Sequence, residues 1–179
     1  RQNAESINFE EECTMGRAKK LRQLLDGGKI ILAPGAYDAW SARLIEKAGF
    51  PAVYMTGYGV SASVLGRPDI GLISMQEMVL AAKNICNCTD VPVIADADNG
   101  YGSSLNVVRT VAEYEQAGVA GIQLEDQVMP KRCGHMEGKQ VIAKEEMVAK
   151  IRAAVYARQD PDTVIIARTD AIAVNGYDD

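Results

Sequence analysis

The segment VIADADNG contains two carboxylates that could bind a metal ion. Asp96 and Asp98 stand two residues apart at the end of an apolar run, and the period of two of a strand puts both side chains on one side. Burying such a pair is costly unless a positive charge compensates it. Hard oxygen ligands without a nearby histidine favour Mg²⁺, or Mn²⁺, over zinc, and Glu125 could add a ligand directly or through water. The alternative is that the two carboxylates cap the turn that follows them.

The segment KRCGH, residues 131–135, contains the single histidine of the sequence. Lys131 and Arg132 could clamp the carboxylates of a substrate, and their charges would tune the Cys133 thiol. A thiol with a reference pKa of about 8.5 is mostly protonated at neutral pH, so Cys133 could donate a proton as well as attack. His135 could orient this donor or bind a carboxylate. The alternative is an ordinary basic surface loop with an incidental cysteine.

These residues belong to a long connection, residues 126–140, between a predicted strand and a predicted helix. Pro130, Gly134 and Gly138 would let this connection act as a mobile flap, and long loops beside a site often serve as lids.

Short segments rich in Val and Ile alternate with amphipathic segments along the chain. The predicted strands are KIILAPG (29–35), AVYMTG (52–57), VPVIADAD (91–98), GIQLED (121–126) and TVIIARTD (163–170). The predicted helices are residues 39–49, 74–85, 105–118 and 143–158, in which apolar residues recur at spacings of three and four. Strands that are almost continuously apolar are typical of a parallel sheet covered on its faces. The repeating unit is therefore a βα step.

Two α/β architectures fit five βα units, namely an open doubly wound sheet and the first part of a (β/α)8 TIM-type barrel. A barrel needs about 250 residues, and the sequence stops where the next helix should begin. We therefore expect the 179 residues to cover about the first five βα units of a barrel, with residues 1–16 as a tail or leader and residues 17–179 as a partial catalytic domain. The strand ends of a barrel share one face. That face would collect Tyr54, Thr56, Gly57, Tyr58, Asp96, Asp98, Glu125, Asp126, Arg168 and Asp170.

Composition excludes several classes of protein. The chain is 47% hydrophobic and 24% charged, with a net charge of -5, and it has no basic stripe, which argues against nucleic acid as a partner. No apolar run approaches the roughly 20 residues that cross a bilayer, and the first residues lack the apolar core of a secretory signal. We expect a cytoplasmic protein without a membrane partner, whose four cysteines form no disulfide framework.

The segment GYGVSA, residues 57–62, formally matches the G-x-G-x-x-A dinucleotide fingerprint after a strand. That motif also needs an acidic residue at the end of the next strand, about 20 residues further on. Glu77 stands at that distance but lies in a predicted helix, so the sequence does not favour a nicotinamide or flavin site.

Five motifs, in this order and spacing, resemble the isocitrate lyase and phosphoenolpyruvate mutase superfamily. They are YMTGYGVSAS, LGRPDIG, ADADNGYG, IQLEDQVMPKRCGH and IIARTDA. The similarity runs from about residue 17 to the end, and KRCGH is similar to the carbon–carbon lyase branch, within which the chain looks most like 2-methylisocitrate lyase and 2,3-dimethylmalate lyase. The resemblance implies a Mg²⁺-dependent retro-aldol cleavage of a 2-hydroxy di- or tricarboxylate to a 2-oxo acid, such as pyruvate, and a second carboxylate.

The resemblance also implies roles for individual residues. Thr56, Gly57 and Tyr58 would bind the 2-oxo acid end, and Arg168 a substrate carboxylate. Cys133 would protonate the carbanion left after cleavage, with Tyr54 as a candidate base for the hydroxyl proton. The residues that would hold the metal and its waters are Asp69, Asp96, Asp98 and Glu125.

The sequence departs from the family pattern in two respects, and two other functions are alternatives to the lyase. The family usually has Ser where this chain has Thr56, so an added methyl narrows the site, and the residues that read the second half of the substrate are absent from this sequence. The same superfamily contains oxaloacetate hydrolases, and a non-catalytic carboxylate-binding fragment is a further alternative. A homotetramer is expected by analogy with the family.

Overall fold

Five parallel strands form one sheet in which neighbours in space are neighbours in sequence. The computed structural model describes residues 16–177, so of the predicted tail only Gly16 lies inside it. The strands are β1 Gly35–Ala36, β2 Val53–Met55, β3 Val93–Asp96, β4 Gly121–Glu125 and β5 Val164–Arg168, in the order β1-β2-β3-β4-β5. A doubly wound sheet reverses its strand order at a switch point, whereas a barrel does not. The strand order therefore indicates the βα-barrel arrangement.

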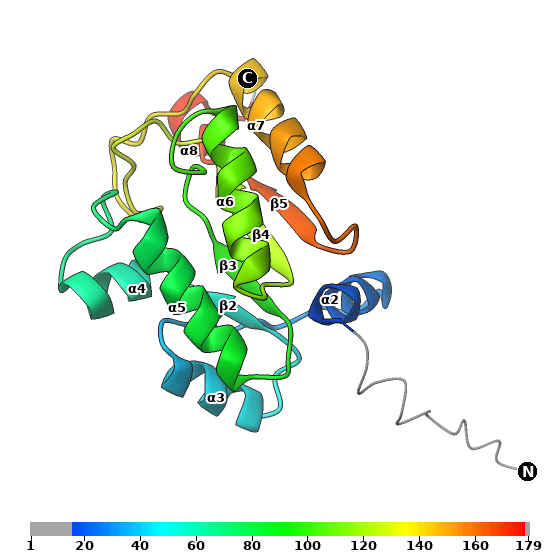
Figure 1. The fold of residues 1–179 in the computed structure, drawn as a ribbon. Helices are drawn as coiled ribbons and strands as arrows, with labels where there is room; N and C mark the ends of the chain where they lie inside the picture. Colours follow the sequence, from blue (N-terminus) through cyan, green and yellow to red (C-terminus); the bar gives the residue numbers. More distant parts are fainter. Residues whose placement is uncertain (1–15, 178–179) are drawn as a thin grey trace, which may run out of the picture.

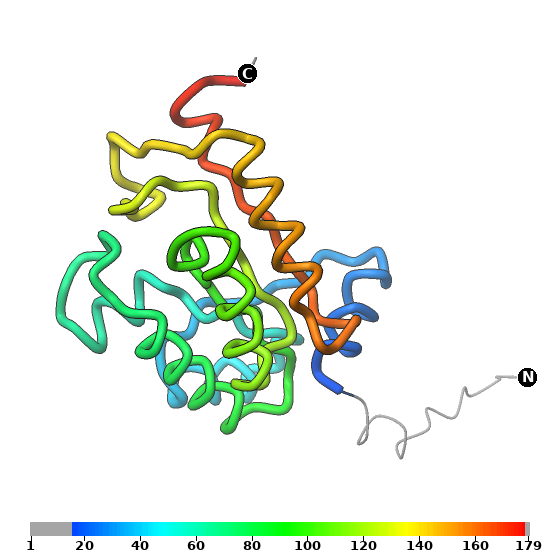
Figure 2. Tube along the Cα trace, turned by 45° about the horizontal axis from the view of Figure 1, so that its top comes forward, coloured from blue at the N-terminus to red at the C-terminus, as the bar shows by residue number. Residues whose placement is uncertain are grey.

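The helices between the strands lie side by side on the outer face of the sheet (Figures 1 and 2). The helical segments are α2 Arg17–Asp26, α3 Ala39–Lys47, α4 Gly57–Val60, the π-helix η1 Ser61–Leu65, α5 Met75–Cys88, α6 Ser104–Gln116, α7 Lys144–Ala157 and α8 Ala171–Asn175. Asp38, Ser74 and Ser103 begin α3, α5 and α6 with capping boxes, which satisfy backbone N–H groups that a helix start leaves unpaired.

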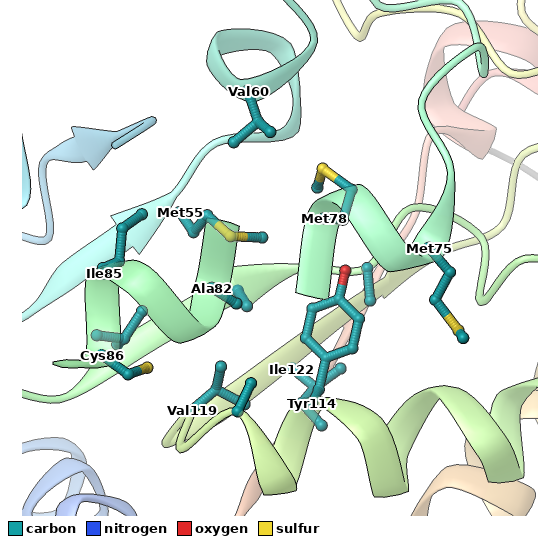
Figure 3. Close-up of a cluster of buried hydrophobic side chains, with 14 of the residues drawn as sticks. Met55, Val60, Met75, Met78, Ala82, Ile85, Cys86, Tyr114, Val119 and Ile122 are labelled. Carbon is teal, nitrogen blue, oxygen red and sulfur yellow. The ribbon is translucent and has the colours of Figure 1, made fainter. Parts of the chain in front are cut away.

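The core lies between these helices and the sheet (Figure 3). Met55 of β2 and Ile122 of β4 meet Met78 and Ile85 of α5, and Tyr114 of α6 stands among them, all fully buried. Burial of such side chains stabilises the fold by about 1.5–3 kcal/mol each relative to exposure. The packed helices thus hold the strands, and with them the ends of the strands, in fixed positions.

The amino ends of the strands are covered by α2, away from the flap (Figure 1). Leu21 is fully buried there with Ala120 and Val164. Other large apolar side chains stay in solvent, and Trp40 on α3 is 72% exposed. No helix within residues 16–177 combines the length and hydrophobicity needed to cross a membrane.

The predicted first strand is largely wrong, because only Gly35 of residues 29–35 is in β1. Ile30 and Leu32 are 92% and 61% exposed. In the described part of the chain β1 pairs only with β2, so these apolar residues have no second neighbour against which to bury. The other four predicted strands are confirmed with shorter bounds, and the predicted helices agree within a few residues.

Candidate active site

Strand alternation divides the side chains of the sheet between two faces. Val53, Met55, Ala95 and Leu124 face the helices and belong to the core, so the residues between them in sequence face the other way. The inner face carries Tyr54, Ile94, Asp96, Gln123, Glu125, Ile166 and Arg168. Glu125 and Arg168 are direct partners in the β4–β5 register, and Arg168 Nη1 lies 3.4 Å from Glu125 Oε2.

Asp96 is held by the turns on either side of it. Its Oδ1 accepts a hydrogen bond from the Asp98 N–H at 3.0 Å, and its Oδ2 accepts one from the Gly57 N–H at 3.3 Å. A Cβ atom at residue 57 would lie 2.8 Å from Asp96 Oδ2, so only glycine permits this approach. Thr56 begins α4 by accepting from the Gly59 N–H. The structure thus places Gly57 against Asp96, with Thr56 directly before it in the chain.

Asp98 lies in a strained turn that other elements support. Its φ of 47° is in the left-handed region, which is uncommon for a residue with a side chain. The next residue, Asn99, donates from its side chain to the Gln127 carbonyl at 3.3 Å, and its own carbonyl accepts from the buried Lys150 at 3.1 Å. The turn is therefore fixed from the flap on one side and from α7 on the other.

The flap is fastened to the sheet at its base. The Val128 N–H donates to the Gln140 carbonyl at 2.9 Å and the Ile142 N–H donates to the Asp126 carbonyl at 2.8 Å. Gln127, which is buried, accepts from the Arg132 N–H and donates to the Arg132 carbonyl, both at 2.9 Å. Residues 126–128 and 140–142 thus form a short antiparallel pairing that positions the tip between them.

The Gln127 side chain also reaches the end of β5. It donates to Asp170 Oδ2 at 2.9 Å and to Glu125 Oε2 at 3.3 Å. Asp170 pairs with Lys139 at 3.3 Å, and Lys139 donates to the Gly134 carbonyl at 2.6 Å. This network joins the flap tip to the strand ends.

The Lys131 side chain does not extend toward solvent but turns into the site, and the carboxylate clamp that we predicted for it stays a prediction. Its side chain is only 3% exposed and ends between Asp69 and Asp98. Nζ lies 2.6 Å from Asp69 Oδ1 and also contacts Asp98 Oδ1. Burial alone would lower the pKa of Lys131, but Asp98 and Asp96 raise it above its usual range. The Lys131 ammonium therefore stays charged at neutral pH and compensates the negative charge of the carboxylates around it.

The rest of the KRCGH motif lies nearer to the surface. Cys133 Sγ lies 3.5 Å from His135 Nδ1, and a Cβ atom at Gly134 would come within 2.5 Å of Arg168 Nη2. Arg132 is exposed and donates to the Glu137 carbonyl at 2.9 Å. The backbone beside Cys133 therefore lies directly over Arg168, while the Arg132 side chain turns toward the flap itself.

Burial changes the acidity of several site residues. It raises the pKa of Glu125 to about 7 against the lowering effect of Lys131 and Arg168, and it raises the pKa of Asp98 to about 6, with a further contribution from Asp96. Burial, and then Asp96, raise the pKa of Tyr54 well above its usual range. The Tyr54 hydroxyl accepts from Gln123 at 2.7 Å. Only the phenolate can take up a proton, and the raised pKa leaves almost none of it at neutral pH, which weighs against the base role predicted for Tyr54.

The buried carboxylates have the donor chemistry for Mg²⁺. Glu125 Oε1 is buried without a hydrogen-bonding partner among residues 16–177, and oxygen donors suit this ion. Within the same residues, however, no three acidic, cysteine or histidine side chains are placed so that they could hold one metal ion together. The Lys131 ammonium lies between Asp69 and Asp98 instead. The residues fit the ion by chemistry, provided that Lys131 moves away.

Comparison with known proteins gives the family. The profile of the phosphoenolpyruvate phosphomutase family matches residues 21–179. The chain belongs to this family. The predicted resemblance to the isocitrate lyase and phosphoenolpyruvate mutase superfamily is thereby confirmed.

Relatives of this phosphoenolpyruvate phosphomutase family member include several lyases. The chain is 59% identical over 165 residues to the 2,3-dimethylmalate lyase of Eubacterium barkeri, covering 92% of this chain and 57% of that protein. It is 49% identical over 158 residues to a 2-methylisocitrate lyase of Aeropyrum pernix, covering 88% of this chain and 50% of that protein. The chain thus spans about half the length of the curated relatives it matches.

Solved structures agree with the barrel assignment. A 2,3-dimethylmalate lyase crystal structure superimposes with a TM-score of 0.87 and 46% identity, covering 92% of this chain and 56% of that one. An oxaloacetate acetylhydrolase bound to 3,3-difluorooxalacetate has the same TM-score and identity, covering 90% and 56%. A phosphonopyruvate hydrolase complex with oxalate and Mg²⁺ is 35% identical, with a TM-score of 0.84, covering 91% and 56%.

The structure brings most of the predicted site residues together, but not all of them. Tyr58 is exposed on α4, and His135 is exposed on the flap. Sequence reasoning missed Gln127, although it follows Glu125 by two residues, the spacing that puts side chains on one side of an extended chain. It also missed Lys150, because nothing in the sequence indicates that a lysine within a helix is buried.

A surface hollow of about 500 Å³ lies elsewhere, at the amino end of the sheet. Arg17 of α2, Glu115 of α6 and Thr163 before β5 are among its lining residues. Glu115 there accepts from the Gln159 N–H and from the Thr163 hydroxyl. These contacts close a loop, and the hollow lies at the opposite end of the sheet from the carboxylates.

Proposed function

We propose that the full-length protein is a Mg²⁺-dependent carbon–carbon lyase. Its substrate would be a 2-hydroxy di- or tricarboxylate of the 2,3-dimethylmalate or 2-methylisocitrate type, cleaved to a 2-oxo acid such as pyruvate and a second carboxylate. The observation that carries the proposal is that residues of the flap contact residues at the carboxyl ends of the strands. Lys131 contacts Asp98, and Gly134 lies against Arg168, which pairs with Glu125. The segment carrying Cys133 is therefore next to the carboxylates.

The relatives support the same reaction class. The 2,3-dimethylmalate lyase and 2-methylisocitrate lyases that this chain resembles are named for such cleavage. Because this chain spans about half of their length, the proposal concerns the whole protein. We also propose a cytoplasmic homotetramer that acts on a small carboxylate, which size-exclusion chromatography with light scattering would test.

Binding would use the strand ends. Asp96, Asp98, Glu125 and Asp69 would hold the ion, directly or through water. A bound Mg²⁺, or Mn²⁺, would polarise the substrate hydroxyl and stabilise negative charge on the oxygen of the 2-oxo acid. Arg168, charged and partly exposed, would bind a substrate carboxylate through paired hydrogen bonds. The Thr56 hydroxyl and the Gly57 backbone beside Asp96 would bind the 2-oxo acid end, with Tyr58 at the margin.

Cleavage leaves an electron pair on the carbon next to the second carboxylate. The Cys133 thiol would donate its proton to that carbon, and the resulting thiolate would be stabilised by the positive charge of Arg132. His135, 3.5 Å from the sulfur, would orient the thiol. The hydroxyl proton needs a base, for which Tyr54 stays a prediction that its raised pKa disfavours.

Turnover with matched cysteine variants tests the proposal. Full-length enzyme with Mg²⁺ and either 2,3-dimethylmalate or 2-methylisocitrate should release a 2-oxo acid. Cys133→Ser should lower kcat by at least about 100-fold, the scale of a lost proton donor, while oxalate binding measured by calorimetry stays within about two-fold. Cys88→Ser, at the far end of α5, is the control and should keep full turnover. Full turnover by Cys133→Ser would remove the thiol from the mechanism.

A second candidate reaction follows from the solved structures. Oxaloacetate acetylhydrolase matches this chain as well as 2,3-dimethylmalate lyase does, each with a TM-score of 0.87 and 46% identity. Oxaloacetate incubated with the full-length enzyme would give oxalate and acetate if the protein is a hydrolase, and pyruvate if it is a decarboxylase. If the lyase proposal is correct, neither product should form faster than it does without the enzyme.

A further inference from the structure

The ammonium group of Lys131 lies among the buried carboxylates of Asp69, Asp96, Asp98 and Glu125, which we call the acidic cluster. Lys131 Nζ is 2.6 Å from Asp69 Oδ1 and contacts Asp98 Oδ1, and the three side chains are almost fully buried. Apart from this ammonium, neither oxygen has a hydrogen-bonding partner among the described residues. Two carboxylates from separate loops therefore face one point, and Nζ occupies it.

A divalent ion bound to both oxygens would need the same space. Mg²⁺ lies about 2.0–2.1 Å from its oxygen ligands, so an ion shared by Asp69 and Asp98 would overlap the present position of Nζ. Two cations this close also repel each other strongly in a buried setting. An ion bound directly to both oxygens and the Lys131 ammonium therefore exclude each other.

The backbone of the flap keeps the ammonium near this position. The Gln127 side chain hydrogen-bonds to both the N–H and the carbonyl of Arg132. A Cβ atom at Gly71 would lie only 3.4 Å from the backbone nitrogen of Lys131. The main chain at Lys131 is thus held between the flap base and the loop that carries Asp69. A group tethered in this way competes at a high effective concentration.

We propose that Lys131 is an internal competitor of the divalent ion and thereby sets the order of binding. The proposal rests on the metal site of the proposed function. In the ion-free protein Lys131 neutralises Asp69 and Asp98. When the ion binds, it displaces the ammonium, which then becomes available to a carboxylate of the substrate. The ion must bind first, and the substrate binds to the site that this exchange creates.

Direct ion binding tests the competition. Mn²⁺ binding to the full-length protein is measured by electron paramagnetic resonance, without substrate, for the wild type and for Lys131→Met. If Lys131 occupies the site about nine-tenths of the time, its removal should tighten Mn²⁺ binding about ten-fold. Lys83→Met, on the exposed side of α5, removes the same charge and should leave the affinity unchanged. Lys131→Gln serves as a second variant should Lys131→Met not fold.

Chemical labelling tests the displacement in the wild type itself. The Lys131 amine should resist acetylation in the ion-free protein because it is buried in ion pairs, and saturating Mn²⁺ should raise its labelling at least about five-fold, if the competition is as assumed above. Mass spectrometry of the peptides quantifies both Lys131 and Lys83, whose labelling should not respond to the ion.

The outcomes separate this proposal from the lyase proposal. Tighter Mn²⁺ binding by Lys131→Met, together with ion-dependent labelling, supports the competition. Equal or weaker binding by the variant, or labelling that Mn²⁺ leaves unchanged, overturns it, while Mg²⁺-dependent turnover would leave the lyase proposal standing. If the wild type binds no Mn²⁺ and its turnover ignores Mg²⁺, the metal site and the competition are both wrong.

Discussion

Glu125 illustrates how burial can make a carboxyl group sensitive to pH. Burial raises its pKa from an ordinary 4.5 to about 7, so the folded protein binds this proton more tightly than the unfolded chain does. The contribution of Glu125 to the free energy of unfolding must then fall as the pH rises from about 4.5 to about 7, by up to about 3 kcal/mol. Above that window it stays constant.

We therefore predict that Glu125→Gln removes part of the pH dependence of stability. Glutamine keeps the shape of the side chain but does not ionise in this range. Urea unfolding of ion-free protein at several pH values between 4.5 and 8 should give a stability that declines more steeply for the wild type than for the variant. Glu145→Gln, on the exposed start of α7, is the matched control and should behave like the wild type. Parallel curves for wild type and Glu125→Gln would contradict the prediction.

Individual site residues were predictable where residue type and strand position coincide. Asp96 and Glu125 end apolar strands, and parallel strand ends meet at one edge. Lys131 was predicted at the same site, but its ion pairs with Asp69 and Asp98 were not, because a lysine in a polar loop looks like a surface residue. Its burial depends on Asp69, from a loop about 60 positions earlier in the sequence, and no local pattern records that pairing.

Among the elements, the turn after β3 depends on α7 for its support. Lys150 is buried in α7, and burial lowers its pKa, yet its ammonium donates to the Asn99 carbonyl at 3.1 Å. This hydrogen bond secures the turn in which Asp98 has a positive φ. A charge is buried here to fix the backbone of a loop.

We predict that Lys150→Met loosens this turn while α7 itself persists. Methionine fills similar space but leaves the Asn99 carbonyl without its donor, at a cost of about 1–3 kcal/mol. Hydrogen–deuterium exchange of residues 97–102 should become faster. Lys144→Met, on the exposed side of the same helix, should leave that exchange unchanged. Unaltered exchange in Lys150→Met would mean that the turn does not depend on α7.

Element types were more predictable than element lengths. The helix signals were strong, since Ser74 with Glu77 forms the capping box that starts α5. The strand predicted at residues 29–35 failed because an apolar run does not show whether a second partner strand lies beside it. In the described chain that partner is missing beyond β1, and Ile30 stays in solvent.

At the scale of the whole molecule, stability and chemistry lie at opposite ends of the sheet. The helix α2 covers the amino ends through Leu21, whereas the acidic cluster and the flap lie at the carboxyl ends (Figure 1). Barrels commonly separate the two in this way. A substitution at the amino end of the sheet should therefore lower the stability of the fold without changing ion binding at the site.

We predict that Leu21→Ala lowers the free energy of unfolding by about 2–5 kcal/mol, because Leu21 is fully buried against Ala120 and Val164. Urea unfolding measures the loss. Below the unfolding transition, the affinity for Mn²⁺ should stay within about two-fold of the wild type. Leu25→Ala, on the same helix but 50% exposed, should change stability by less than about 0.5 kcal/mol. A large drop in Mn²⁺ affinity for Leu21→Ala would show that the two ends are coupled.

The apolar pattern of the sequence by itself fits two architectures, of which we predicted the barrel. Both a doubly wound sheet and a barrel consist of βα units, and the apolar patterns of their strands are the same. Strand order distinguishes them, and it results from the packing of α3, α5, α6 and α7 beside one another. Five motifs spread along the chain nevertheless indicated the family correctly, and four of them span the end of a strand.

The position of Trp40 has a practical consequence for spectroscopy. It is the single tryptophan of the sequence, and it stands in solvent on α3. Its emission would report on that outer surface and stay flat while the acidic cluster is titrated. The phenols are better placed, since Tyr101 contacts Tyr114 and Tyr114 donates to the Asp96 carbonyl. Ultraviolet difference absorbance of these tyrosines, rather than indole fluorescence, is the optical signal suited to this protein.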